Sequence, residues 1–366
     1  MSPLSIFWPV LAGHAFQQTA LIGMVPVLAL ALGLHESEIG LAVAIGLVTA
    51  GAALPFVSLL GGRIVVLGGL GGLLLANFGL FYLIGHGGHG WNALLVLGLL
   101  ALIRSVQGVS AAGLMLAAQT QGAAQKDSRK GLGIVQSMGS VGRIFSAALI
   151  GPLLLISPLA PLLPAAFGAL ASLLLSRGQA APRLRACIRP PRLTAFRVTL
   201  LTQGAVGAAQ IGLAPLILDR LDADPVRAAG YAGLCLAAAN LGLFLSLRLL
   251  VPRVGGMGAR GAGLLLVLAA LSAPLADQLS VFILLSFIIG GSTGLLFTLN
   301  LSEIMTREDY AQHQVTGWNG AIQIAALAGG VALGSALMAL SPAAPFAIVA
   351  LSGAALALAP PSTQRT

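Results

Sequence analysis

Long apolar runs alternate with short polar connections along the whole chain. A helix needs about 20 mostly apolar residues to cross a bilayer, because each residue rises about 1.5 Å. The runs are continuous, which argues against the alternating pattern of a membrane barrel and leaves helices as the structure that satisfies the backbone in lipid. We therefore expect twelve transmembrane helices, near residues 7–33, 39–60, 64–84, 91–119, 131–156, 158–175, 197–218, 228–250, 261–276, 279–301, 315–340 and 344–358.

The composition indicates a membrane protein. Hydrophobic residues make up 57% of the 366 residues and charged residues only 8%, too few charges to cover a soluble fold of this size. The 48 glycines suit helices that approach one another closely in lipid. The net charge of +9 does not indicate nucleic-acid binding, because the basic residues gather in particular connections. The two cysteines, Cys187 and Cys235, indicate no disulfide framework.

The distribution of arginine and lysine predicts the orientation in the membrane. If twelve helices cross, most of the basic residues outside the helices fall on the side of both termini, and only Arg220 and Arg227 fall on the other side. Basic connections stay in the cytoplasm. Arginine also far outnumbers lysine, which is typical of a bacterial genome rich in G and C. We expect a multi-pass protein of the bacterial inner (cytoplasmic) membrane with both termini in the cytoplasm.

A short motif repeats at half the length of the chain. The pattern S-P-x-A-P at 157–161 recurs at 341–345, before the sixth and the twelfth apolar run. This recurrence predicts a parallel duplication, with six-helix bundles at 1–175 and 197–366 and a basic cytoplasmic linker at 176–196. The alternative is chance recurrence in a chain rich in proline and alanine.

One stretch resembles a known family. Arg104-Ser105-Val106-Gln107-Gly108 resembles the R-x-x-Q-G signature in the fourth helix of the major facilitator superfamily, and residues 131–152 resemble its fifth helix. The motifs are most similar to those of the tetracycline-efflux type of drug and proton antiporter, although Ala147 replaces the first glycine of the G-x-x-x-G-P motif. The resemblance implies an all-α membrane protein with two pseudo-symmetric six-helix bundles that transports a solute by alternating access.

The family's cytoplasmic loops are only partly preserved. The connections after the second and the eighth apolar run retain Arg63 and Arg253 but lack the acidic residue of the family pattern. Glu303 could supply that partner. We expect Arg63, Arg253 and Glu303 to form a cytoplasmic gate.

Two arginines lie near the middle of apolar runs. Arg104 lies about 20 Å along a helix that begins at Trp91, and Arg143 about 18 Å along a helix that begins at Gly131. An arginine at that depth costs about 2.5–3.5 kcal/mol on insertion scales, so its side chain faces a bundle interior or a wet cavity. The two arginines therefore predict a polar pathway, although the first could instead be structural.

Other polar residues share helix faces with these arginines, while the third, sixth, ninth and twelfth runs carry almost none. The resemblance implies that those four helices lie outside and that the others surround the cavity. Some of the polar side chains could instead only tie helices together. The expected substrate-binding residues are His14, Gln17, Gln18, Arg104, Gln107, Gln136, Arg143, Gln203, Gln210, Asn240, Asn300, Trp318, Asn319 and Gln323.

The positive charge favours an anionic or strongly hydrogen-bonding small organic solute, because the carboxylates of the first half all lie in connections. One alternative is proton-coupled efflux of a drug or siderophore with His14 or Glu303 as the proton carrier. A second is a receptor or scaffold on the same fold that transports nothing.

No catalytic, phosphate-binding or dinucleotide-binding pattern appears in the sequence, so we expect neither an enzyme nor a cofactor nor a metal site. The expected partners are a small-molecule substrate, the lipid bilayer and protons as the candidate coupling ion. We expect no nucleic-acid partner, and we expect a monomer.

Overall fold

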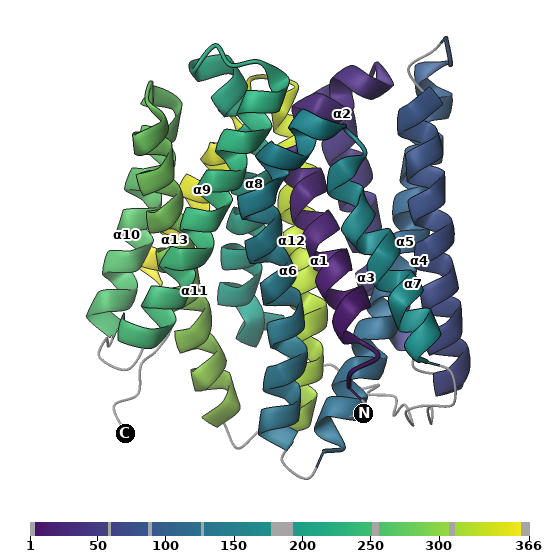
Figure 1. Cartoon of the computed structure of the whole chain (residues 1–366). Helices are drawn as coiled ribbons and strands as arrows, with labels where there is room; N and C mark the ends of the chain where they lie inside the picture. The colour runs from purple at the N-terminus through teal and green to yellow at the C-terminus, as the bar shows by residue number, and fades with distance from the viewer. Residues whose placement is uncertain are drawn as a thin grey trace.

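The computed structural model is an all-helical molecule (Figure 1). The residues that it describes are 4–57, 60–86, 90–125, 128–176, 193–250, 256–306 and 312–359.

The first half of the chain contains seven α-helices and one 3₁₀ turn among the described residues. They are α1 (Trp8–Gly23), α2 (Val25–Leu32), α3 (Glu36–Val57), α4 (Gly62–His86), α5 (Ala93–Ala123), α6 (Ser128–Ile156), η1 (Ala160–Leu162) and α7 (Leu163–Leu175).

The second half has six α-helices and three short helical turns among the described residues. They are η2 (Leu193–Phe196), α8 (Arg197–Arg220), α9 (Pro225–Leu245), the π-turn η3 (Ser246–Leu250), α10 (Gly256–Ser272), η4 (Ala273–Leu275), α11 (Leu279–Thr306), α12 (Gln312–Met338) and α13 (Pro345–Leu358).

The helices confirm the predicted multi-pass membrane protein. Among the described residues, nine helices are long and apolar enough to cross a membrane, and the bent pair of α1 and α2 makes a tenth. The segment 160–175 and the helix α13 are shorter apolar helices. Together they correspond to the twelve expected crossings.

The first crossing differs from the expected single helix at 7–33. It bends by 75° between α1 and α2, at Met24. Pro26 lies in the first turn of α2. Proline has no N–H to donate to the carbonyl four residues earlier, and its ring clashes with that carbonyl, so the first helix cannot continue unbroken through this position. The second helix ends at Gly33, whose φ of 64° is a left-handed cap that suits glycine.

The two halves of the chain pack in the same pattern. Helix α1 packs against α6 and α7, and α8 packs against α12 and α13 in the same way. The pairs α3 with α5 and α4 with α5 correspond to α9 with α11 and α10 with α11. Two further pairs, α3 with α12 and α6 with α9, join the halves. The helices α4 and α10 lie at opposite lateral edges of the molecule (Figure 1).

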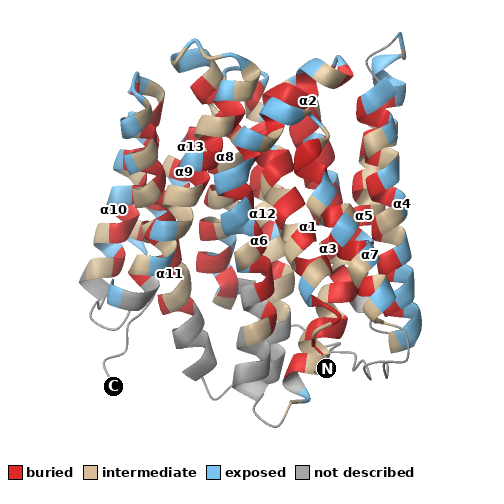
Figure 2. Cartoon of the chain, in the orientation of Figure 1, coloured by how far each residue is buried: buried red, intermediate tan, exposed pale blue. Residues whose placement is uncertain are grey.

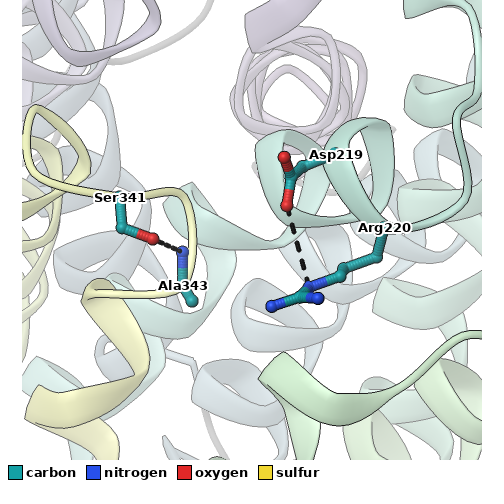
Figure 3. A network of polar contacts seen from close by, with 4 residues as sticks. All are labelled: Asp219, Arg220, Ser341 and Ala343. Carbon is teal, nitrogen blue, oxygen red and sulfur yellow. Dashed lines mark hydrogen bonds and ion pairs between the residues drawn. The ribbon is translucent and has the colours of Figure 1, made fainter.

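The repeated motif folds into the same turn twice. The hydroxyl oxygen of Ser157 accepts a hydrogen bond from the backbone N–H of Leu159 at 3.2 Å, and Ser341 accepts one from Ala343 at 3.2 Å. Figure 3 shows the second turn, together with the ion pair of Asp219 and Arg220 at 3.7 Å. Both turns lie at the end of the molecule where α2 lies, which we call the distal end. The end where α1 begins is the proximal end.

Figure 2 shows exposed residues along the outer helices and buried residues along the helices in the middle. Many of the exposed residues are large and apolar. On the edge helix α4, for example, Leu75 is 71% exposed and Phe78 is 65% exposed. Such a surface is stable in lipid and would be costly in water.

Adjacent glycines on α12 offer a test of the helix packing. A Cβ added to Gly330 would meet the backbone of Gly204 on α8, whereas one added to Gly329 would meet nothing within 4 Å. We expect Gly330→Ala to lower the thermal unfolding midpoint in detergent, since overpacking costs about 1–3 kcal/mol. Gly329→Ala should leave the midpoint unchanged or raise it, because alanine favours a helix over glycine. Equal effects of the two substitutions would contradict the close approach of α8 and α12.

Candidate functional site

A cavity of about 350 Å³ lies at mid-depth between the halves, mostly against the second half. Its walls come from α8, α9 and α11, and α1, α6, α12 and α13 each contribute one or two residues. Leu213, Leu236 and Phe297 belong to its apolar wall. The volume is at the small end of the range for pockets that bind organic ligands.

Five of the residues expected from the sequence line this cavity. They are Arg143, Gln203, Gln210, Asn240 and Gln323. Arg143 is the only charged side chain among the described lining residues, and none of them is a carboxylate. The cavity is therefore a polar, positively charged site with an apolar wall.

The polar groups of the cavity have free hydrogen-bonding capacity. Among the residues that the structure describes, the guanidinium of Arg143 has neither a hydrogen bond nor an ion pair, and Gln203 has no side-chain partner. The same holds for Gln210 and Gln323. Asn240 donates from its amide nitrogen to the carbonyl of Leu236 at 2.8 Å, which leaves its amide oxygen as an acceptor. Each glutamine amide can both donate and accept, whereas the guanidinium of Arg143 only donates, so the arginine gives the site its excess of donors.

The cavity is closed on its distal side by contact between α6 and α9. A Cβ added to Gly151 would lie 3.2 Å from the Cα of Gly230, so the two backbones meet where neither residue has a side chain. Gly233 lies against the side chain of Ile150 and the backbone of Ala147. At the same distal end, Gly40 near the start of α3 packs against Ser335 near the end of α12.

Arg104 lies in a separate polar network within the first half. The side chain is 1% exposed. Its Nη1 donates to the amide oxygen of Gln107 at 2.5 Å, and its Nη2 donates to that of Gln18 at 2.6 Å. Gln107 in turn donates to Gln17 at 3.3 Å and to Asn77 at 3.2 Å. The network joins α1, α4 and α5, and no carboxylate takes part in it among the described residues.

A smaller network occurs in the second half. The hydroxyl of Thr199 on α8 donates to the amide oxygen of Asn319 at 3.2 Å and accepts from the amide of Asn300 at 3.4 Å. Both asparagines are buried. The side chains of Asn300 and Asn319 therefore tie α11 and α12 to α8, as Gln17 and Gln107 tie α1 to α5.

The remaining predicted residues fall into three groups. His14 and Trp318 each have a buried ring nitrogen, Nδ1 and Nε1, without a partner in the described part of the chain. Arg63 is exposed near the start of α4. The side chains of Gln136, Arg253 and Glu303 lie outside the described residues, so the cytoplasmic gate stays a prediction.

The sequence reasoning missed several polar residues of these networks. Asn77 is the hub at which Gln17 and Gln107 meet, and it lies in a run that otherwise looked apolar. The amide of Asn77, alone in an otherwise apolar run, was the sequence signal that could have identified this hub. Ser286, Thr293 and Thr298 of α11 line the cavity. Their hydroxyls gave no signal, because serine and threonine in a membrane helix often bond only to the preceding turn.

Comparison with known proteins supports the fold. No protein-family model and no curated protein matches the sequence. Solved structures match over nearly the whole chain. A bacterial homologue of the human lysosomal transporter Spinster, inward-facing and occupied, has a TM-score of 0.68, with 14% identity over 97% of this chain and 93% of that chain. A bacterial homologue of the iron transporter ferroportin, inward-facing, has a TM-score of 0.65, with 16% identity over 97% and 98%.

A third structure, a D-xylose–proton symporter, has a TM-score of 0.67 at 14% identity over 97% of this chain and 96% of that chain. These likenesses confirm the predicted fold, an all-α membrane protein of twelve helices in the two-bundle arrangement of the major facilitator superfamily. The three similar structures are named as transporters.

Glutamines in the buried network around Arg104 and glutamines that line the cavity should respond differently to substitution. Gln107→Leu removes an acceptor from the buried guanidinium of Arg104, and a hydrogen bond to a charged group contributes about 1.5–3 kcal/mol. We expect this variant to unfold at a clearly lower temperature in detergent. Gln323→Leu removes an amide that faces the cavity, so its unfolding midpoint should stay near that of the wild type. A stable Gln107→Leu variant would show that the network does not hold the first half together.

Proposed function

We propose that the chain is a secondary active transporter that moves a small organic anion across the membrane by alternating access. The observation that carries the proposal is the cavity of about 350 Å³ between the halves, in which Arg143 is the only charged described lining residue. A free guanidinium in a cavity at membrane depth is costly unless water or an anion solvates it, and it forms strong paired hydrogen bonds with carboxylate, phosphate or sulfonate groups.

The rest of the cavity favours an anion with a neutral organic body. Gln203, Gln210 and Gln323 can donate to oxygen atoms or accept from hydroxyl and amide groups. Phe297 and Leu236 supply apolar contact on the same wall. An inorganic anion has no apolar part to contact that wall, and the positive charge of Arg143 would repel a cation.

The contacts between the halves support a rocking movement. The contact of α6 with α9, which we call the distal seam, closes the distal side of the cavity. At Gly151 and Gly230 it is a contact between backbones, without side chains of these two residues. With both termini in the cytoplasm, as the basic connections predict, the cavity would be reached from the cytoplasm in this conformation. Opening of the seam and closure of the proximal side would expose the same site to the outside, while the six-helix units 1–175 and 197–366 move as bodies.

Arg104 has a structural role in this proposal. Its guanidinium is held by Gln18 and Gln107, and it does not reach the cavity. Amide oxygens substitute for water around the buried charge, so the arginine can fix α5 against α1 and α4 without a counter-ion.

Proton-coupled efflux of a drug or siderophore is the second candidate. The resemblance to the tetracycline-efflux antiporters supports it, and so does His14, whose buried Nδ1 has no partner in the described part of the chain. Histidine is the side chain whose ordinary pKa lies nearest to neutrality. Under this alternative, transport would depend steeply on a pH gradient and would be lost in His14→Gln, whereas the anion transporter proposed here needs neither.

A binding screen tests the anion preference. We expect at least one of p-aminohippurate, benzenesulfonate, shikimate and glucuronate to bind purified wild-type protein in calorimetry, and its uncharged amide or sulfonamide counterpart to bind at least about tenfold more weakly. Arg143→Gln should weaken binding of the anion by about 10- to 100-fold, because a hydrogen bond to a charged group contributes about 1.5–3 kcal/mol.

The control for this screen is Arg63→Gln, which removes an exposed arginine outside the cavity and should bind like the wild type. Equal binding of the charged and uncharged compounds, or binding of none of them, would contradict the proposal.

A cross-link tests the rocking movement. In a background with Cys187→Ser and Cys235→Ala, we expect Gly151→Cys with Gly230→Cys to form a disulfide on oxidation once the seam opens by about 1–2 Å, because the two backbones are adjacent and a disulfide joins Cα atoms about 5.5–6 Å apart. The oxidised double variant should lose transport in proteoliposomes and recover it on reduction. The single variant Gly151→Cys should show the same activity with and without the oxidant. Full transport by the cross-linked protein would show that the distal seam does not open.

A further inference from the structure

Arg143 places its positive charge at the boundary between the two halves of the chain. It lies on α6, whereas the other described lining residues lie on α8, α9, α11, α12 and α13, apart from Thr19 and Ile22 on α1. The surroundings of this guanidinium therefore belong mainly to the opposite half. They must change whenever the two halves move relative to each other.

Arg104 is solvated in the opposite manner. All of the partners in its network, on α1, α4 and α5, belong to its own half. These partners move with it when the halves rock, so the energy of the Arg104 charge stays the same in every conformation. Of these two arginines, only Arg143 lines the cavity, so only its surroundings differ between an empty and an occupied site.

A carrier that alternates between two openings passes through a state in which its site is closed to both sides. Closure removes the water that solvates Arg143 in the open state. Among the described lining residues no carboxylate is present, and the amide oxygens of Gln203, Gln210 and Gln323 make no hydrogen bond to this guanidinium, unlike the amides around Arg104. An unpaired charge in such a closed site is strongly unfavourable, whereas a charge paired with an anion is much less so. The empty carrier is thus expected to change conformation far more slowly than the loaded one.

We propose that the chain is an obligate anion exchanger, in which each change of conformation in either direction needs an organic anion beside Arg143. The inference rests on the proposed function and adds the mode of transport to it. A proton cannot take the place of the anion, because the guanidinium of arginine is already protonated and stays so. The exported and imported compounds would then both be small organic anions, and their gradients would drive each other.

Counterflow in proteoliposomes tests this inference. The probe is radiolabelled p-aminohippurate, or whichever of the four anions named above binds most tightly. One set of vesicles contains the same unlabelled anion, and the other contains only potassium sulfate buffered at the same pH. Potassium and valinomycin on both sides hold the membrane potential at zero, so that charge movement does not limit either rate. We expect initial uptake to be at least about tenfold slower into the vesicles that lack the anion.

Substitution of Arg143 provides the matched comparison. In Arg143→Gln the empty site has no charge to bury. The uptake rate of the uncharged amide of the probe should therefore be the same into vesicles with and without unlabelled amide inside. Arg143→Lys keeps the charge and should keep the dependence on internal anion. Should the glutamine variant not fold, Arg143→Met removes the charge with a side chain of similar length.

The outcomes separate this inference from the proposed function. Equal uptake of the probe by loaded and empty wild-type vesicles overturns obligate exchange and leaves an anion transporter. No protein-dependent uptake in either set overturns the proposed function together with the inference. A requirement for internal amide in Arg143→Gln would show that exchange is obligatory for a reason other than this arginine and would overturn the inference.

Discussion

The structure depends on how two arginine charges are solvated at membrane depth without acidic partners. Water solvates a guanidinium well and hydrocarbon does not, so each charge must find polar groups within the protein. Arg104 finds them in the amide oxygens of Gln18 and Gln107 and is sealed among them. Arg143 finds none among the described residues and faces a cavity instead. The same residue type is thus a structural element in one helix and an open binding group in the next.

This difference follows the division of the chain into halves. The polar networks around Arg104 and Thr199 each lie within one half and stabilise it internally. Between the halves, the contacts on the distal side are close approaches of small residues, such as Gly151 with Gly230 and Gly40 with Ser335. Strong directional bonds therefore hold each unit rigid, and weak close packing joins the units. That combination suits two bodies that rock about a central site.

Much of the fold was predictable from the sequence. The length of the apolar runs predicted the helices, and the recurrence of S-P-x-A-P predicted the similar packing of the halves, because the same serine turn forms at Ser157 and Ser341. The bend at Met24 was not predicted. The residues on both sides of it are equally apolar, and the effect of Pro26 depends on its place within a helix that the pattern shows as continuous.

The site was predictable only in part. Composition and spacing placed both arginines at mid-depth but could not say which one faced a cavity, because that depends on the rotation of each helix about its axis and on side chains from distant segments. Arg104 is sealed by Gln18, 86 positions away, whereas no such residue reaches Arg143. The position of the cavity against α8, α9 and α11 likewise results from packing between helices, which no local pattern records.

Chemical modification of arginine in the native protein tests this account most directly. The folded protein in detergent is treated with phenylglyoxal, and each arginine is quantified by peptide mass spectrometry with and without a bound organic anion. The account predicts that Arg143 reacts and is protected by the anion, that exposed Arg63 reacts with or without it, and that Arg104 does not react until the protein unfolds. Modification of Arg104 as fast as Arg143, or an unreactive Arg143 while Arg63 reacts, would contradict it.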